Sequence, residues 1–170
     1  LVVMSRKASD FLKDIYAVSE EKIAFIHHGI PDTPFIDSSF NKDKFGVESK
    51  KVLLTFGLLS PNKGIENVLQ ALPAVIKKHP DVVYIILGAT HPHILKVHGY
   101  AYRIMLQQLV RKLDIGEHVI FQQRFVTLRE LCEFLGIADI YLTPYLDEAQ
   151  ITSGTLAYAM GTGKAVISTP

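Results

Sequence analysis

The stretch VLLTFGLLSPNKGIENVLQALPAVIKKHPDVVYIILG, residues 52–88, decides the class of fold. It begins and ends with short apolar runs, residues 52–56 and 82–87, and a glycine follows each run. Between the runs, apolar residues recur every three or four positions over about residues 64–78, which predicts an amphipathic helix. Because both runs are apolar on both faces, they are typical of strands in a parallel sheet with helices on each side.

The alternation of strand and helix continues to the end of the chain. A closed barrel of eight such units would need more than 170 residues, so we predict an open, doubly wound, Rossmann-like parallel sheet of the α/β class. Pro73 predicts a kink or a break in the first helix, and Thr127 with Glu130 predicts a capping box at the start of a later one. Further helices are predicted over Tyr100–Leu113, Thr127–Ile137 and Ser153–Gly161, and further strands over Val119–Phe121, Ile140–Thr143 and Ala165–Ser168.

The first fifty residues differ from the rest. Val2–Ser5 and Ile23–Ile26 have the pattern of short strands, and Arg6–Tyr16 has the pattern of an amphipathic helix. Residues 29–46 are rich in proline, aspartate, serine and asparagine, which predicts a long loop or linker.

Composition excludes several classes of protein. A net charge of +1, from 18 Lys and Arg against 17 Asp and Glu, gives no general field for binding nucleic acid. The single cysteine, Cys132, excludes an intrachain disulfide and a C-x-x-C site. No apolar run is long enough to span a bilayer and no secretory signal opens the chain, which predicts the cytosol. The chain starts inside an apolar run and stops after a strand-like run, so we expect a fragment of a longer protein.

Ligands of open parallel sheets bind beyond the carboxyl ends of the strands, and two segments there have the chemistry of anion sites. In the first, Lys63 and Gly64 lie at a helix start, where free amides and a cation favour an anion; the alternative is a solvated lysine on an ordinary loop. In the second, Ser153, Gly154 and Thr155 offer amides and hydroxyls at another helix start, and the alternative is a capped helix. Two such sites facing one another suggest a diphosphate. Neither a Walker P-loop nor a G-x-G-x-x-G motif is present.

Other chemistry-bearing residues have simpler interpretations. Arg124 follows the third strand of the sheet and either contacts a phosphate or a base or lies on the surface. His91 and His93 are interpreted as polar loop residues, because a metal site would need two more ligands. Structural or packing roles are predicted for His27, His28, Cys132 and Asp139.

Four segments in order resemble a known family of enzymes. They are IHHGI (26–30), FGLLSPNKGIE (56–66), ADIYLTPY (138–145) and SGTLAYAMGTGKAVIS (153–168). They resemble the donor-binding half of the retaining glycosyltransferases of family 4, typified by sucrose synthases and bacterial group 1 glycosyltransferases. The resemblance implies the C-terminal half of a GT-B fold.

The resemblance also implies a domain organisation. Residues 1–30 would be the end of the N-terminal domain or the crossover into the second domain, and residues 31–46 a loop or linker. Residues 47–170 would be the nucleotide-sugar-binding, Rossmann-like domain, cut short at its C-terminal end. The acceptor-binding N-terminal domain would be missing, so the fragment alone is expected to be inactive.

The phosphate-binding motif of the family, G-R-x-x-x-x-K-G, is only partly present. Gly57, Lys63 and Gly64 match it, but Leu58 stands where the arginine belongs. We hypothesise that Arg124 compensates, because it is expected at the same edge of the sheet.

The family also has two glutamates separated by seven residues. Gln150 stands at the first position, which is less usual for the family. Tyr158 stands at the second, which is similar to bacterial glycogen and starch synthases; Glu148 would take the first role if the loop is bulged. By resemblance, the first position contacts the donor sugar near the reacting carbon and the second holds the ribose. The backbone amides of Ser153, Gly154 and Thr155 would meet the diphosphate and sugar, and Phe125 and Val126 would border the base.

The resemblance implies a retaining hexosyltransferase that acts from a nucleotide-diphosphate sugar on a saccharide or lipid-linked acceptor. Lys63 and either Glu148 or Gln150 would be the catalytic residues. The main contribution to catalysis would be stabilisation of the departing diphosphate in the transition state. No metal, cofactor or nucleic acid is expected, and peripheral membrane association would come only through the missing part. The alternatives are a non-catalytic module that binds a nucleotide-sugar or a partner protein, and a nucleotide-sugar epimerase of the same fold.

Overall fold

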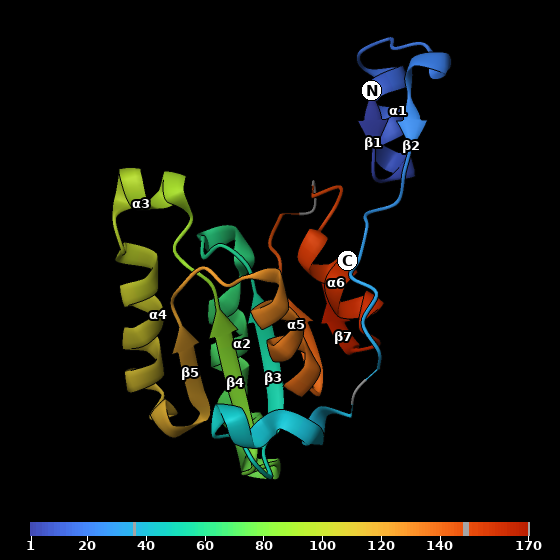
Figure 1. The fold of residues 1–170 in the computed structure, drawn as a ribbon. Coiled ribbons are helices and arrows are strands. Elements are labelled where there is room, and N and C mark those ends of the chain that lie inside the picture. Colours follow the sequence, from blue (N-terminus) through green and yellow to red (C-terminus); the bar gives the residue numbers. More distant parts are fainter. Residues whose placement is uncertain (36, 148–149, 170) are drawn as a thin grey trace.

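The computed structural model describes residues 1–35, 37–147 and 150–169. Its main feature is a five-stranded sheet in the order β5-β4-β3-β6-β7, and every neighbouring pair of strands is parallel (Figure 1). The predicted doubly wound α/β sheet is therefore confirmed. The strands are β3 (Lys51–Phe56), β4 (Val82–Leu87), β5 (Val119–Gln122), β6 (Ile140–Thr143) and β7 (Ala165–Ser168).

Helices cover both faces of the sheet. On one face, α2 and α4 pack side chains such as Leu69 and Leu106 against it, and on the other face α5 and α6 contribute Leu135 and Ala159 (Figure 1). None of the helices in the described ranges is long and apolar enough to cross a membrane. The helices of this domain are α2 (Ile65–Lys78), α3 (Pro92–His98), α4 (Ala101–Lys112), α5 (Leu128–Ile137) and α6 (Gly154–Gly161).

Strand β4 shows why the apolar run 82–87 specifies a two-sided core. All six of its residues are buried. Val82, Tyr84 and Ile86 belong to the cluster under α2 and α4, whereas the residues that alternate with them belong to the cluster under α5: Val83, Ile85 and Leu87. This follows from the alternation of side chains along a strand, which sends successive residues to opposite faces.

The topology fixes where a ligand site belongs. From β3 the chain moves outward through β4 to β5, and it then returns to the other side of β3 to form β6 and β7. Strand β3 therefore pairs with both β4 and β6. The connections reverse direction there, and the crevice beyond the carboxyl end of β3 is the expected binding site in such sheets.

Two local expectations need correction. Helix α2 contains Pro73 and nevertheless continues to Lys78, so the proline does not break it. The segment with His91 and His93, interpreted as a loop, contains the additional helix α3, with Pro92 in its first turn. A proline is favourable there because the first turn of a helix leaves its N–H groups without partners.

The N-terminal residues form a small separate unit. Strands β1 (Val2–Val3) and β2 (Ala24–Phe25) pair in parallel around α1 (Arg6–Asp14), and the 3-10 turn η1 (Glu20–Lys22) precedes β2. The chain then runs as an extended segment beside α6 and β7 (Figure 1).

The predicted linker 31–46 is only partly a linker. Residues 38–45 form η2 (Ser38–Phe45), which packs on α5 through a contact of 4.8 Å between the ring centroids of Phe45 and Phe134. The packed domain thus begins near residue 38, where the sequence prediction placed it at residue 47. The reason is tertiary: the polar composition of η2 is typical of a loop, but its Lys42 is buried by a partner far away in the sequence.

That partner is Asp139, which anchors η2 to the centre of the sheet. One carboxylate oxygen accepts hydrogen bonds from Lys42 Nζ at 2.7 Å and from the Val52 amide at 2.6 Å, and the other accepts from the Ser38 hydroxyl. Burial alone would raise the pKa of Asp139, but these three donors outweigh it and hold that pKa below its usual range. The sequence predicted that Asp139 orders the turn before its strand; its carboxylate instead accepts from Ser38, Lys42 and Val52, which are far from that turn in sequence.

We expect Asp139→Asn to lower the free energy of unfolding by about 2 kcal/mol at pH 7, because Lys42 loses its counter-charge in a buried place. Since the folded-state pKa is depressed, this contribution is full above the unfolded pKa of about 4 and disappears as the pH falls through the folded value. Urea unfolding at pH 7 and at acid pH measures it, with Asp43→Asn, an exposed aspartate of η2, as the control. An equal difference between wild type and variant at both pH values would contradict this role.

Candidate functional site

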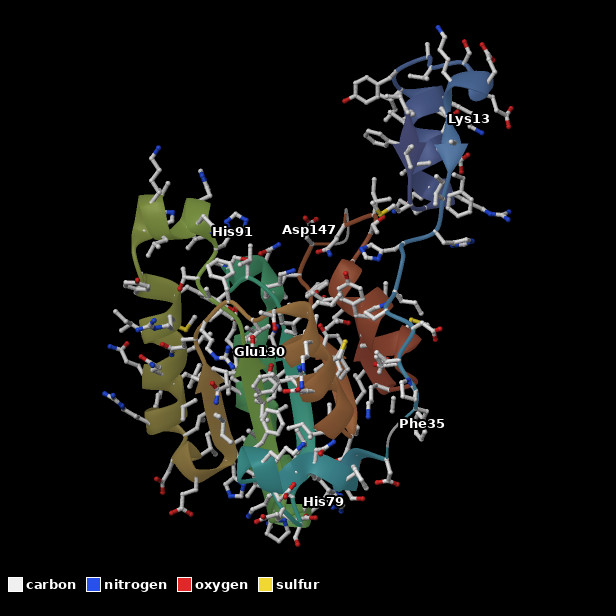
Figure 2. All side chains as sticks on the ribbon, viewed as in Figure 1. Lys13, Phe35, His79, His91, Glu130 and Asp147 are labelled. Atoms are coloured by element: carbon white, nitrogen blue, oxygen red, sulfur yellow. The ribbon has the colours of Figure 1, made fainter. Side chains whose placement is uncertain are left out.

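Two joined cavities lie beyond the carboxyl ends of β3 and β4. The Phe125 cavity has a volume of about 200 Å³ and the Lys63 cavity about 360 Å³, and both are lined by Gly57, Leu58 and Thr155. Figure 2 shows His91 at this end of the sheet and His79 at the opposite end. The Phe125 cavity is also lined by Phe56, Gly88, Ala89, Arg124, Phe125 and Val126, and the Lys63 cavity by Ser60, Asn62, Lys63, His91 and Ile94.

Gly57 and Gly88 line the Phe125 cavity, and their backbones lie in direct contact. Gly57 has φ 144° and Gly88 has φ 140°, in the region that side chains disfavour. A Cβ atom on Gly88 would lie 1.9 Å from the carbonyl oxygen of Gly57. Only a residue without a side chain therefore allows the two strand ends to meet here.

The loop that carries Lys63 is fixed against the chain leaving β6. It forms the 3-10 turn η3 (Pro61–Lys63), and Gly64 follows at φ 60°, where a Cβ would lie 2.1 Å from the Pro144 carbonyl oxygen. The amide of Leu146 also donates to the Asn62 carbonyl at 2.9 Å. These contacts hold Lys63 at the mouth of the site.

Tyr145 connects the two predicted anion sites. The Lys63 ammonium lies 3.9 Å from the centroid of the Tyr145 ring, within cation–π range. The hydroxyl of Tyr145 lies 2.8 Å from Thr155 Oγ1 and 3.3 Å from Ser153 Oγ. The structure therefore brings Lys63 and the start of α6 together through a residue that sequence reasoning missed.

Helix α6 begins at the position predicted from the sequence, directly after Ser153. Ser153 is the N-cap and its hydroxyl accepts a hydrogen bond from the Leu156 amide at 3.3 Å. Ser153 Oγ and Thr155 Oγ1 are 3.1 Å apart. Their hydroxyls and the free amides of the first turn can donate together to one anion.

Arg124 lies in the Phe125 cavity and not among the described residues that line the Lys63 cavity. Its guanidinium donates to Glu130 at 2.5 Å, and Glu130 completes the predicted capping box with Thr127. The Thr127 amide, followed by Arg124 and the Thr127 hydroxyl, lowers the pKa of Glu130 to about 2. Glu130 thus positions Arg124 while it remains a carboxylate.

The residues at the two glutamate positions lie elsewhere. Tyr158 is half-buried on α6, with its ring edge-on to His28 at 5.5 Å between centroids, and it is not among the described residues that line either cavity. Gln150 donates to the Thr152 carbonyl at 3.3 Å, and it too is absent from both linings in the described ranges. Glu148 lies outside the described residues.

His28 packs as predicted. Its Nε2 atom lies 2.8 Å from the position that a Cβ on Gly154 would take. The lack of a side chain at Gly154 therefore allows the segment after β2 to lie against the start of α6.

His91 is a lining residue that the sequence interpretation did not select. Its Nδ1 atom accepts from the His93 amide at 3.1 Å, so that it caps α3 while it faces the Lys63 cavity. The available signal was its position three residues after the glycine that ends β4. Within the described ranges, no group of three His, Cys, Asp or Glu side chains is placed to hold a metal ion.

A third cavity, larger than these two, lies away from the strand ends. It has a volume of about 450 Å³ between the segment containing Pro31 and Pro34 and the outer side of α5. Cys132 lines it and is partly exposed, which corrects the prediction of a core cysteine; burial raises the pKa of its thiol. Sheets of this topology bind their ligands beyond the carboxyl ends of the strands, and this cavity lies elsewhere, so we assign the candidate site to the strand ends.

Comparison with known proteins agrees with this geometry. Residues 37–170 match the family described as "Glycosyl transferases group 1". The chain belongs to this family. Its parallel sheet with helices on both faces matches the Rossmann-like C-terminal domains of GT-B glycosyltransferases.

Two relatives and one solved structure are similar to this chain. Spore coat protein SA of Bacillus subtilis (strain 168) is 29% identical over 101 residues, which is 59% of this chain and 26% of that protein. The GDP-mannose-dependent alpha-(1-6)-phosphatidylinositol monomannoside mannosyltransferase of Mycolicibacterium smegmatis is 27% identical over 103 residues, 61% of this chain and 24% of that one. Anabaena Alr3699/HepE, in complex with UDP and glucose, superposes with a TM-score of 0.74 at 21% identity, covering 98% of this chain and 43% of that one.

The chain spans about a quarter of the length of the curated relatives that it matches. It spans less than half of the length of the Anabaena protein.

Proposed function

We propose that this chain is the donor-binding part of a retaining glycosyltransferase that moves a hexosyl group from a nucleotide-sugar to a saccharide or lipid-linked acceptor. One observation carries the proposal. The Phe125 cavity, which is apolar and contains an aromatic ring, adjoins the Lys63 cavity, which contains a lysine, at the strand ends where the order of the strand connections reverses. A nucleotide-sugar has the matching parts, a flat base joined through a ribose to a charged diphosphate.

The Phe125 cavity suits the nucleoside. Phe56, Leu58 and Val126 give it apolar walls, and the Phe125 side chain is 70% exposed. An exposed ring of this kind can stack on a base, and the guanidinium of Arg124 can donate to base or ribose oxygens.

In this proposal, the diphosphate would bind where the linings of the two cavities meet. Thr155 lines both cavities. Tyr145 contacts Lys63 through its ring, and its hydroxyl contacts the hydroxyls of Ser153 and Thr155. When the bond to the sugar breaks, negative charge develops on the departing diphosphate. Donors that already point at that position stabilise the transition state more than the ground state.

The first glutamate position is part of the proposal. Gln150 can hydrogen-bond a sugar hydroxyl but carries no charge, so Glu148 would supply the negative charge that faces an oxocarbenium-like transition state. Tyr158 stands at the second glutamate position of the family motif, but its ring packs against His28 and it is not among the described residues that line either cavity, so we assign it no contact with the ribose.

A calorimetric panel of UDP, GDP and ADP, with their sugars, tests the proposal. We expect one nucleotide series to bind with one site per chain and to raise the melting temperature, since a ligand of the folded state stabilises it. The panel includes more than one base because one similar protein is named for GDP-mannose and another was crystallised with UDP. Binding should persist in EDTA. Failure of all three series to bind would refute the proposal.

A second function is favoured by one observation. Leu58 lines both cavities where the family motif places an arginine, so the chain could be a nucleotide-sugar-binding module without catalysis. Assay of the complete two-domain protein separates the two functions. Sugar transfer that is lost in Lys63→Ala supports the enzyme, and binding without turnover supports the module.

Arg124→Ala is expected to weaken nucleoside diphosphate binding about 5-fold, because an exposed charged donor contributes about 1 kcal/mol. Arg129→Ala is the matched control, since Arg129 lies on α5, pairs with Glu133 and faces neither cavity at the strand ends. Calorimetry measures both affinities. An affinity of Arg124→Ala equal to that of wild type would remove Arg124 from the site.

A further inference from the structure

His91 is held rigidly beside the Lys63 loop, because the pairing of β3 and β4 continues past the ends of the strands. The Leu59 amide donates to the Ala89 carbonyl at 2.8 Å, and the His91 amide donates to the Leu59 carbonyl at 2.9 Å. Leu59 and Thr90 form a parallel bridge between these bonds. The His91 amide is thus held by Leu59, and its carbonyl accepts from the Leu95 amide of α3, although His91 belongs to no strand.

The hydrogen bond that caps α3 also sets the tautomer of His91. Nδ1 accepts from the His93 amide, so the proton of the neutral ring resides on Nε2. Among the described residues, no protein group accepts a hydrogen bond from this Nε2–H. His91 is half-buried and lines the Lys63 cavity, so its Nε2–H is a candidate donor to a ligand there.

The cavity has few other donors for a highly charged ligand. Lys63 is the one lysine or arginine among the described residues that line it, and Leu58 is apolar. The other nearby cation, Arg124, is held by Glu130 in the Phe125 cavity. A diphosphate has two phosphoryl groups, and its charge increases as the bond to the sugar breaks, so one lysine leaves oxygens without a protein donor.

We propose that the Nε2–H of His91 binds a diphosphate oxygen of the nucleotide-sugar beside Lys63, as a catalytic residue of the transfer; this rests on the proposed function. Since the ring donates in its neutral form, it needs no protonation to act. A hydrogen bond from the protein to a charged oxygen is stronger than one to a neutral acceptor, so this contact strengthens as the diphosphate departs.

His91→Asn tests the proposal without removing the helix cap, because asparagine is itself a favourable N-cap residue. Its side chain is shorter than the imidazole, so its amide cannot take the place of Nε2. We expect an affinity for UDP or GDP, whichever wild type binds, about 10-fold weaker than wild type in calorimetric titration of this chain. The affinity for the matching nucleoside, uridine or guanosine, and the melting temperature should not change. His93→Asn, an exposed neighbour in the same helix, is the control.

The outcomes separate the two proposals. If wild type binds the nucleotide and His91→Asn binds it within 2-fold, the assignment of His91 is refuted and the donor site stands. If the variant loses nucleoside affinity to the same extent, His91 acts on the shape of the site and not on the diphosphate, which also refutes the assignment. If wild type binds none of the nucleotides, both proposals fail.

Discussion

Replacement of Lys63 by alanine should weaken nucleoside diphosphate binding about 30- to 150-fold, the largest effect expected of any side chain in the site. A hydrogen bond between charged groups in a partly enclosed cavity contributes about 2–3 kcal/mol, and no second lysine or arginine stands among the described residues that line this cavity. The variant should retain its affinity for the nucleoside alone, because the Phe125 cavity is unchanged. Calorimetric titration of both ligands measures the difference.

Lys77→Ala is the matched control for Lys63→Ala. Lys77 lies in the last turn of the same helix that Lys63 precedes, at the far end from the site, and it is exposed. We expect no change in affinity for this control. A loss of less than about 5-fold in Lys63→Ala would mean that the lysine is a solvated residue of an ordinary loop.

Gly88→Ala is expected to lower the free energy of unfolding by about 3–5 kcal/mol, the largest effect on stability. The added Cβ would lie 1.9 Å from the Gly57 carbonyl oxygen, and this neighbour is backbone in the centre of the sheet. The φ of 140° at Gly88 adds strain for any residue that has a side chain. Urea denaturation followed by circular dichroism measures the change.

Gly136→Ala is the matched control for Gly88→Ala, and its effect should have the opposite sign. Gly136 lies inside α5, and a Cβ there would meet nothing within 4 Å. Alanine in a helix is favoured over glycine by up to about 1 kcal/mol, so this variant should be as stable as wild type or more stable. A Gly88→Ala protein within about 1 kcal/mol of wild type would show that the two strand ends can separate at little cost.

The sheet was predictable because its signals are local. The run that forms β4 is apolar at consecutive positions, and this pattern occurs when helices cover both faces of a strand. The cap of α5 is also local, since Thr127 and Glu130 are three residues apart and satisfy one another's amides.

Features that depend on distant partners could not be predicted in the same way. The polar sequence of η2 is typical of a linker. In the fold, however, Asp139 pairs with Lys42 and holds η2 against the sheet. Cys132 has an apolar neighbourhood in sequence, but the outer side of its helix faces a cavity.

The candidate site shows the same division. Lys63 and Ser153 were selected because each stands at a helix start, and helix starts are recognisable from sequence. The contacts of Tyr145 with both residues depend on the path of the chain after β6, which the sequence alone did not predict. His91 was interpreted as a loop residue because its role requires two facts of the fold: the pairing of its backbone with Leu59 and the cavity that its ring lines.

The anchor at Asp139 bears on the order in which the chain folds. Its carboxylate holds the Val52 amide and Lys42, which lie 87 and 97 residues earlier in the chain. The central strand can therefore pair early with β4, its neighbour in sequence, but its other edge stays open until most of the domain has been synthesised. Contacts of such long sequence separation slow folding, since the chain entropy must be lost before they form. During synthesis, the edge of β3 that later receives β6 is therefore open to unwanted pairing with other chains until β6 has been made.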